Sequence, residues 1–314
     1  METILESRLL NRLTQKKARL DALRPLPSGI LARLAENLNV EWIYNSNAIE
    51  GSTLTLRETE LILQQGITIG GKSLREHFEV INHRDAIEYV QTLARNDEPI
   101  SPFHVRQIHQ LVLARIDDEN AGQYRRTNVR IGGATHIPPE AFRVAPEMNA
   151  WSKWLNTKAA ALHPIDRAAL AHHRLAAIHP FVDGNGRTAR LVMNLLLMRD
   201  GYPPTVILRV NRVQYYRVLA QADREKNAPL INFVGRAVEL SLSLYLDAVD
   251  SRTRRAAKQG EWIPLRDAAH GTPYSQEYLS LLARIGRLDA KKIGRVWHTT
   301  RRAVKAYRDS VTKR

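Results

Sequence analysis

HPFVDGNGRTAR, at residues 179–190, is the stretch that decides the fold of this 314-residue sequence. His179 has a side chain that titrates near neutral pH and can act as a general base. Asp183 supplies a hard carboxylate oxygen of the kind that Mg²⁺ prefers. Gly184-Asn185-Gly186 can turn consecutive backbone N–H groups towards an anion. The stretch therefore predicts phosphate chemistry at one short loop.

A helix is expected directly after this loop. Its N-terminus carries a positive partial charge that attracts the same anion. Arg187 and Arg190 are three residues apart, so both lie on one face of the first turns. Residues 191–198 are apolar on nearly every side, which is typical of a buried helix that holds the loop rigidly. The alternative interpretation is an ordinary glycine-rich turn between two helices. Such a turn would not require a histidine, an aspartate and two arginines together with the glycines.

The stretch resembles, without any departure, the signature of the Fic (Fido) family, His-Pro-Phe-x-Asp/Glu-Gly-Asn-Gly-Arg-x-x-Arg. The likeness extends over about residues 40–245 and is greatest for members with an N-terminal inhibitory helix. Shorter matches lie at AIEGS (48–52), GKSL (71–74), HIPP (136–139), GYPP (201–204) and YY (215–216). The resemblance implies an all-α fold: a helical Fic core with a short β-hairpin flap.

The resemblance also implies protein AMPylation, in which AMP passes from ATP to a Ser, Thr or Tyr hydroxyl of a target protein. His179 would deprotonate the hydroxyl, and Asp183 would bind Mg²⁺ between the phosphates. Phosphate-transferring members have Lys at the position of Gly186, so the glycine favours adenylyl transfer. The implied ATP-binding residues are Glu50, Gly133, Ala134, Thr135, His136, Asp183, Gly184, Asn185, Gly186, Arg187, Thr188, Ala189, Arg190, Tyr215 and Tyr216.

Two alternatives stay open at this stage. The same site would serve to remove AMP from a modified target, with Glu50 orienting the attacking water. Alternatively, the chain is a DNA-binding regulator whose Fic domain only senses a nucleotide, although binding alone needs no base such as His179. The partners expected are ATP and an unknown target protein, and self-modification and a homodimer also remain open.

The motif SNAIEG, at residues 46–51, resembles the inhibitory pattern of the family, Ser/Thr-x-x-x-Glu-Gly/Asn. The i,i+4 spacing places Ser46 and Glu50 on one helix face. A glutamate in the last helical turn is disfavoured by the helix dipole, so a cation from elsewhere is expected. We predict an ion pair of Glu50 with Arg190, which would keep that arginine from the γ-phosphate and inhibit the enzyme.

Residues 129–139 (VRIGGATHIPP) are predicted to form a short hairpin, because Gly132-Gly133 lies between β-branched residues. The resemblance implies that this flap covers the nucleotide and aligns a target segment as an added strand. It also implies that Tyr215 and Tyr216 lie near the adenine. Asp223 replaces an asparagine that is associated with the base in the animal member.

Hydrophobic periodicity predicts helices through most of the chain. They are expected at about residues 4–23, 28–50, 74–95, 101–116, 146–157 and 164–177, with a capping box at 55–58 that starts another. We divide the chain into an N-terminal helical region with the inhibitory helix (1–100), the Fic catalytic core (101–238), and a linker helix with a small winged-helix domain (239–314). The polar run at 252–260 is the expected linker.

Positive charge gathers in the last fifth of the chain. The whole sequence has 47 Lys+Arg and 32 Asp+Glu, but from Ser251 onward there are 16 and 5. Residues 260–314 resemble the winged helix-turn-helix of excisionase-like and MerR-like DNA-binding modules, with helices at 265–269 and 275–286 and a wing at 290–297. The predicted core residues are Leu279, Leu281, Leu282 and Ile285, and the predicted DNA phosphate contacts are Lys291, Lys292, Arg295, Arg301 and Arg302. A docking module that never touches DNA is the alternative.

Composition excludes several classes of protein. The sequence has no cysteine, so it has no disulfide, thiolate metal site or thiol nucleophile. Its N-terminus carries acidic residues and lacks a long apolar core, unlike a secretory signal. The most apolar run, residues 191–198, is far shorter than the ~20 residues of a membrane span. We expect a cytoplasmic protein without a membrane segment.

Overall fold

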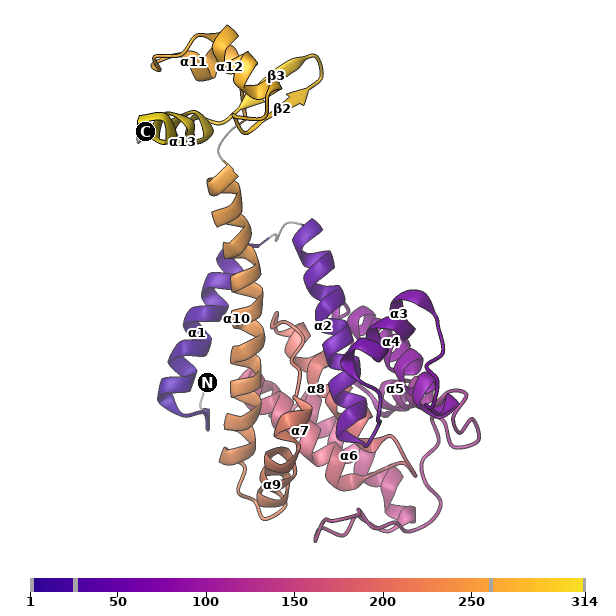
Figure 1. Ribbon diagram of the computed structural model, residues 1–314. Coiled ribbons are helices and arrows are strands. Elements are labelled where there is room, and N and C mark those ends of the chain that lie inside the picture. Colours follow the sequence, from indigo (N-terminus) through magenta and orange to yellow (C-terminus); the bar gives the residue numbers. More distant parts are fainter. Residues whose placement is uncertain (1–2, 25–27, 260–261, 313–314) are drawn as a thin grey trace. The chain divides into compact units, whose positions relative to one another are not determined.

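The computed structural model describes residues 3–24, 28–259 and 262–312 of the chain (Figure 1). It divides into two compact units, Met1–Leu246 and Asp247–Arg314. The first unit contains α1 (Ser7–Ala22), α2 (Ser28–Ile49), α3 (Leu56–Gln65), α4 (Leu74–Ala94), α5 (Pro102–Leu113), α6 (Val144–Asn156), α7 (Pro164–Ile178), α8 (Asn185–Arg199), α9 (Arg212–Ala222) and most of α10 (Ala228–Gln259), with short 3₁₀ turns at Ala141–Arg143, Lys158–Ala161 and Arg209–Asn211. The all-α prediction is confirmed.

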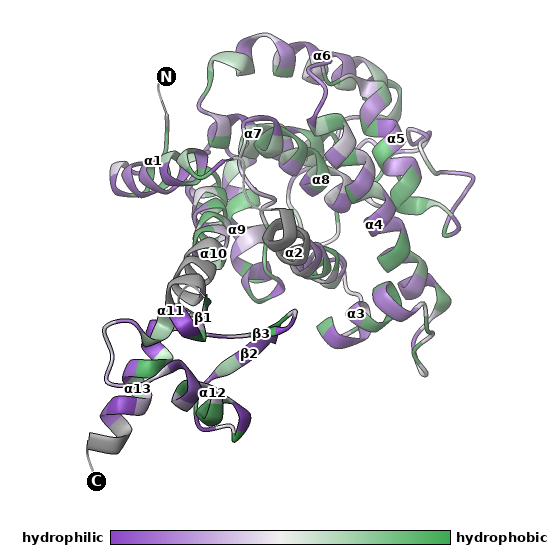
Figure 2. Ribbon diagram, turned by 90° about the horizontal axis from the view of Figure 1, so that it is seen from above, coloured by the Kyte–Doolittle hydropathy of each residue, from purple (hydrophilic) through white to green (hydrophobic). Residues whose placement is uncertain are grey.

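Helix α8 is the centre of the first unit. It packs against α2, α4, α5 and α7, and nearly all of its side chains are buried, as its apolar sequence predicts (Figure 1). Its polar interruption, Asn194, exchanges two hydrogen bonds with the backbone of Thr205, at 2.6 and 2.9 Å. Figure 2 shows strongly hydrophobic residues, in green, around α7 and α8. Helix α8 is therefore held in place by packing along most of its length.

The end of α2 and the start of α3 determine where the motif at residues 46–51 lies. Thr55 and Glu58 form the predicted capping box at the start of α3. Gly51, with φ of 111°, has a backbone conformation that side chains other than glycine rarely adopt, and α2 ends two residues before it. Glu50 consequently lies just beyond the last turn of α2, between the helix and its terminating glycine.

Helix α1 is anchored on α10. A Cβ atom at Gly235 would lie 2.7 Å from Cδ2 of Leu5, so the glycine permits the close approach of the two helices. Arg12 and Lys16 both pair with Glu239, each at 2.8 Å. One hydrophobic cluster runs from Leu5 to Leu246, so the regions 1–100 and 101–238 share a single core.

The β-hairpin predicted for residues 129–139 is wrong. All of these residues are described and none is in a strand; the Ala134 N–H donates to Ile131 O in a turn. Pro138 and Pro139 have no N–H to donate to a ladder. The carbonyls of Thr127 and Pro139 accept hydrogen bonds from Arg125 instead of from an opposing strand.

The second unit is a small mixed domain with its own core. After α10 it contains β1 (Ile263–Pro264), α11 (Leu265–Ala269), α12 (Gln276–Arg284), β2 (Ala290–Ile293), β3 (Val296–Thr299) and α13 (Arg301–Thr312). The sheet is antiparallel with the order β1-β3-β2. The predicted short helix, second helix and strand pair are therefore confirmed as elements.

Half of the core predicted for this unit is wrong. Leu279 and Leu282 are buried, but 46% of Leu281 and 56% of Ile285 are exposed. The helical period of 3.6 residues explains the difference, because positions 281 and 285 share a face of α12 that is rotated away from 279 and 282.

The linker expected at residues 252–260 is helical as far as Gln259, where α10 ends, and Gly260 lies outside the described residues. None of the helices in the described ranges is both long and apolar enough to span a bilayer.

Candidate active site

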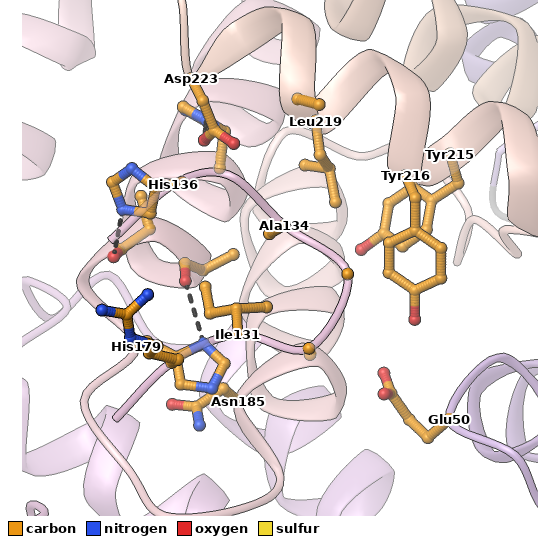
Figure 3. A pocket seen from close by; sticks show the side chains of 18 of the residues that line it. Glu50, Ile131, Ala134, His136, His179, Asn185, Tyr215, Tyr216, Leu219 and Asp223 are labelled. Atoms are coloured by element: carbon orange, nitrogen blue, oxygen red, sulfur yellow. Dashed lines mark hydrogen bonds and ion pairs between the residues drawn. The ribbon is translucent and has the colours of Figure 1, made fainter. Parts of the chain in front are cut away.

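A cavity of about 570 Å³ opens at the N-terminus of α8. It is enclosed by the loop at residues 130–136, the end of α7, the loop before α8, one face of α9 and Glu50 (Figure 3). Its lining residues are Glu50, Arg130, Ile131, Gly132, Gly133, Ala134, His136, His173, Ala176, Ala177, His179, Val182, Asp183, Gly184, Asn185, Gly186, Arg190, Arg212, Tyr215, Tyr216, Leu219, Ala220 and Asp223.

His179 ends α7 in the left-handed conformation, with φ of 50° and ψ of 57°. Burial lowers the pKa of its imidazole below the ordinary 6.5, so the ring is neutral at pH 7. Nδ1 lies 3.3 Å from the carbonyl oxygen of Ala176 (Figure 3). A ring that donates Nδ1–H to this carbonyl keeps the lone pair of Nε2 for accepting a proton.

The loop between His179 and α8 is rigid because buried side chains hold its backbone. The Asn185 amide accepts from the N–H of Phe181 and donates to its carbonyl, both at 2.9 Å. The His109 ring stacks on Phe181 at 3.6 Å between centroids and bonds the Asp183 carbonyl through Nε2 at 2.9 Å. Burial lowers the pKa of His109 to about 4, so its Nε2 is a neutral donor. The Asn185 side chain is therefore engaged with the backbone of the loop, and its backbone N–H remains for an anion.

Two arginines engage the Asp183 carboxylate. Arg75 pairs with Oδ2, Arg187 lies 3.4 Å from Oδ1, and the N–H of Gly184 also donates to Oδ1. Burial acts to raise the pKa of Asp183, but Arg187, the Gly184 N–H and Arg75 outweigh it and lower the pKa below 3.8. Asp183 is therefore ionised at neutral pH.

An ionised carboxylate fits Mg²⁺, but the described residues contain no group of three or more His, Cys, Asp or Glu side chains placed to hold a metal. Mg²⁺ commonly takes one or two carboxylates and completes its shell with substrate phosphates and water. Asp183 alone therefore fits a metal that arrives with a nucleotide, once Arg75 releases Oδ2.

Four of the predicted nucleotide residues do not line the cavity: Thr135, Arg187, Thr188 and Ala189. Arg187 instead pairs with Glu79 of α4 at 3.2 Å and with Asp183 at 3.4 Å. Thr188 and Ala189 are fully buried in the packing around α8. A motif fixes which residue types are present, but the helical period turns consecutive positions to different faces.

The predicted pair of Glu50 with Arg190 is confirmed. Arg190 Nη2 lies 2.8 Å from Oε1 of Glu50, and the guanidinium also donates to the hydroxyl (3.1 Å) and the carbonyl (2.8 Å) of Ser46. Only 3% of the Arg190 side chain is exposed. Burial acts to lower the pKa of this arginine, but Glu50 and Tyr215 outweigh it and raise the pKa above its ordinary value. The carboxylate lies so close to Gly186 that a Cβ atom there would overlap Oε1.

The opposite end of the cavity is lined by α9 and α7. Tyr216 is part-exposed beneath Arg212, whose guanidinium lies 4.9 Å from the ring centre, whereas Tyr215 is buried and bonds His172 at 2.7 Å. Asp223 pairs with Nε2 of His173 at 2.8 Å, far from Glu50 (Figure 3). Outside the predicted flap, the lining residues that the sequence did not predict are His173, Ala176, Ala177, Val182, Arg212, Leu219 and Ala220. Spacings of three and four from Tyr215 and Tyr216 would have identified Arg212, Leu219 and Ala220.

The five cations predicted to contact DNA are all exposed in the second unit. Lys291 and Lys292 are on β2, Arg295 lies in the β2–β3 turn, and Arg301 and Arg302 begin α13. The Lys291 ammonium also lies 4.4 Å from the centre of the Trp262 ring.

Comparisons with known proteins agree on one family. Residues 99–197 match the model of the Fic/DOC family. The chain is 41% identical over 246 residues to "Protein adenylyltransferase Fic" of Nematostella vectensis, which covers 77% of this chain and 56% of that protein. The chain therefore spans about half the length of the curated relatives it matches.

Solved structures show the same similarity. A Fic domain containing signaling protein from Bacteroides thetaiotaomicron is 30% identical, with a TM-score of 0.72, and the match covers 76% of this chain and 97% of that one. A fragment of Fic-1 from C. elegans is 33% identical, with a TM-score of 0.71 and coverages of 78% and 73%.

The overlap at Gly186 gives a test of the Glu50 position. We expect Gly186→Ala to lose about 1–3 kcal/mol of stability, because the added methyl group meets the carboxylate and lies 3.1 Å from Nη1 of Arg190. The loss should be smaller when Glu50 is already glycine. Denaturation of the four proteins in a double-mutant cycle measures the coupling. Equal losses in both backgrounds would place the carboxylate elsewhere.

Proposed function

Because this chain belongs to the Fic/DOC family, we propose that it is a protein adenylyltransferase, which transfers AMP from ATP to a Ser, Thr or Tyr hydroxyl of a target protein. The observation that carries the proposal is the shared cavity of a neutral, buried His179 and the glycine loop at the N-terminus of α8. A binding site for nucleotide alone would need the loop but not the base.

In the proposed reaction the target oxygen attacks the α-phosphorus of ATP while His179 accepts the hydroxyl proton at Nε2. The bond from that phosphorus to the bridging oxygen breaks, and pyrophosphate leaves. Asn185 and Gly186 offer the free N–H groups of the first turn of α8 to phosphate oxygens, since the Gly184 N–H is taken by Asp183. Mg²⁺, if held by Asp183, would offset phosphate charge.

We further propose that Glu50 inhibits this reaction. Its carboxylate pairs with Arg190, the cation best placed to bind the terminal phosphate. It also fills the space above Gly186, where that phosphate would lie. ATP would then bind with its α-phosphate misaligned for in-line attack. A second candidate, removal of AMP from a modified target, draws on the same observation, since a carboxylate that lines the cavity is also placed to orient a water molecule.

His179→Ala should lower AMP transfer by at least about 100-fold, because a positioned general base contributes that much or more. Binding of ATP should persist, since the phosphate loop is intact. Transfer is measured with labelled ATP on the protein itself and on cell lysate, with exposed His270→Ala as the matched control. Transfer by His179→Ala at the wild-type rate would remove the histidine from the mechanism.

Glu50→Gly should raise self-AMPylation, seen as an added AMP mass on the intact protein. Glu50→Gly with Arg190→Ala should lose most of the gain, because the arginine is then missing from the productive complex. The matched control is Glu36→Gly, an exposed residue of the same helix. Glu50→Gly activity at or below wild type at saturating Mg·ATP would end the case for inhibition and favour AMP removal.

We also propose that the second unit binds DNA through its exposed cations, supported by the excess of 16 Lys+Arg over 5 Asp+Glu from Ser251 onward. Five phosphate contacts predict a fall of about 4.5 in log affinity per decade of salt. Lys291→Glu with Lys292→Glu should weaken binding to a duplex of mixed sequence without changing AMP transfer. The control Lys226→Glu, in the first unit, should change neither DNA binding nor AMP transfer. If the protein does not bind DNA even at low salt, the second unit is instead a docking module that never touches DNA.

A further inference from the structure

Arg125 is a buried cation that has no acidic partner among the described residues. Only 3% of Arg125 is exposed, and burial alone lowers the pKa of its guanidinium. Every hydrogen bond that its side chain makes in the described part of the chain goes to a backbone carbonyl. The other buried arginines of the site, Arg187 and Arg190, pair with carboxylates. Arg125 therefore needs an explanation other than charge pairing.

The three carbonyls belong to two elements of the active site. Nε donates to His179 O at 2.8 Å, Nη1 donates to Thr127 O at 3.0 Å, and Nη2 donates to Pro139 O. The Arg125 N–H donates to Pro180 O at 2.9 Å. Thr127 and Pro139 are the two ends of the loop that covers the cavity, so one guanidinium closes this loop and holds it to the histidine.

A buried cation is a poor way to gain stability. Removing a charge from water is unfavourable, and hydrogen bonds to neutral carbonyls return only part of the loss. The planar fork of arginine, however, reaches three fixed acceptors at once, which the single ammonium of lysine cannot do in the same geometry. The contacts of Arg125 consequently fix the positions of the three carbonyls more than they stabilise the fold.

We propose that Arg125 is a positioning residue that fixes the cavity-covering loop and His179 as one rigid unit. It sets the carbonyl of a histidine that is held in the left-handed conformation, and thereby the direction of the imidazole. It also sets the ends of the loop whose residues 130–134 line the cavity. A target segment aligned on this loop is then presented at a fixed distance from Nε2.

For activity, this inference rests on the proposed transfer of AMP, and the test uses the Glu50→Gly background. Arg125→Lys should lower the maximal rate of self-AMPylation by about 10- to 100-fold, because a displacement of ~1 Å has that effect. The ATP concentration for half-maximal rate should change less than about threefold, since the phosphate loop is untouched. A variant that is only less stable would remain folded at a temperature well below its unfolding. Its maximal rate would then not fall while the ATP concentration for half-maximal rate stayed the same.

Arg199→Lys is the matched control. Arg199 is also an arginine whose pKa is lowered by burial, and it donates to the carbonyls of Glu98 (2.8 Å) and Leu93 (3.1 Å), away from the cavity. Its replacement should change neither quantity more than about twofold. Equal effects of the two variants, or a full rate for Arg125→Lys, would overturn the proposal.

Hydrogen exchange tests the inference without any activity. Arg125→Lys should speed exchange of two amides together: that of Ala141, which Asn128 binds at the base of the loop, and that of His179. If no variant transfers AMP, the proposed function fails while this result still decides the role of Arg125. Exchange that changes at neither amide would overturn it.

The wild-type protein provides a second measurement if Arg125→Lys does not fold. With arginine labelled by ¹⁵N, the Nε–H of Arg125 should exchange slowly and share one opening rate with the amides of Ala141 and Arg125. An Ala141 amide that opens more than about tenfold faster than the Arg125 Nε–H would mean that the loop moves independently of the guanidinium.

Discussion

The active site depends on a helix that begins inside the protein. Because α8 is buried along most of its length, Arg187 and Arg190 in its first turns are shielded from bulk water and need fixed partners, whereas the N–H groups of Asn185 and Gly186 face the cavity. Ser46 and Glu50 bind Arg190, whereas Glu79 and Asp183 pair with Arg187, whose buried Nε has no hydrogen-bond partner among the described residues. The same shielding makes these groups strong binders of any anion that replaces such a partner. Inhibition by Glu50 and nucleotide binding, as we propose them, are two solutions of one electrostatic requirement.

Exchange between the two solutions is favoured over simple opening. Removing one partner of a buried ion pair leaves an uncompensated charge, which costs about 3–5 kcal/mol. Glu50 itself is only part-buried, with 32% of its side chain exposed, so its departure into water is less costly than the isolation of Arg190. A phosphate that arrives as the carboxylate leaves keeps the guanidinium paired throughout. The position of Glu50 at the terminus of α2 gives it a short path to solvent.

The sequence predicted the residue types of the site better than their directions. The motif at 179–190 and the spacing of Ser46 and Glu50 predicted that His179 and Asp183 share one site and that Glu50 pairs with Arg190, because each prediction depends on contacts between a few fixed positions. The sequence did not indicate that the Asn185 amide binds Phe181 or that Arg187 pairs with Glu79, because these contacts depend on how the loop and α4 pack against α8. The hairpin was predicted from β-branched residues around a glycine pair, but the prolines of its second half leave the ladder without donors. Arg125 gave no signal, since its acceptors are backbone carbonyls with no characteristic sequence.

The buried arginines of the first unit differ in what binds them, and in the mechanism that we propose this difference determines which of them can change partner. Arg190 is paired with a carboxylate on a side chain that can be replaced by another anion, so its partner is exchangeable. Arg125 is bound by carbonyls of the chain itself, and no anion can replace them without breaking the loop that they close. A regulated transferase needs both kinds of contact: one cation that changes partner when the nucleotide binds, and one that keeps the base and the covering loop in place while it does so.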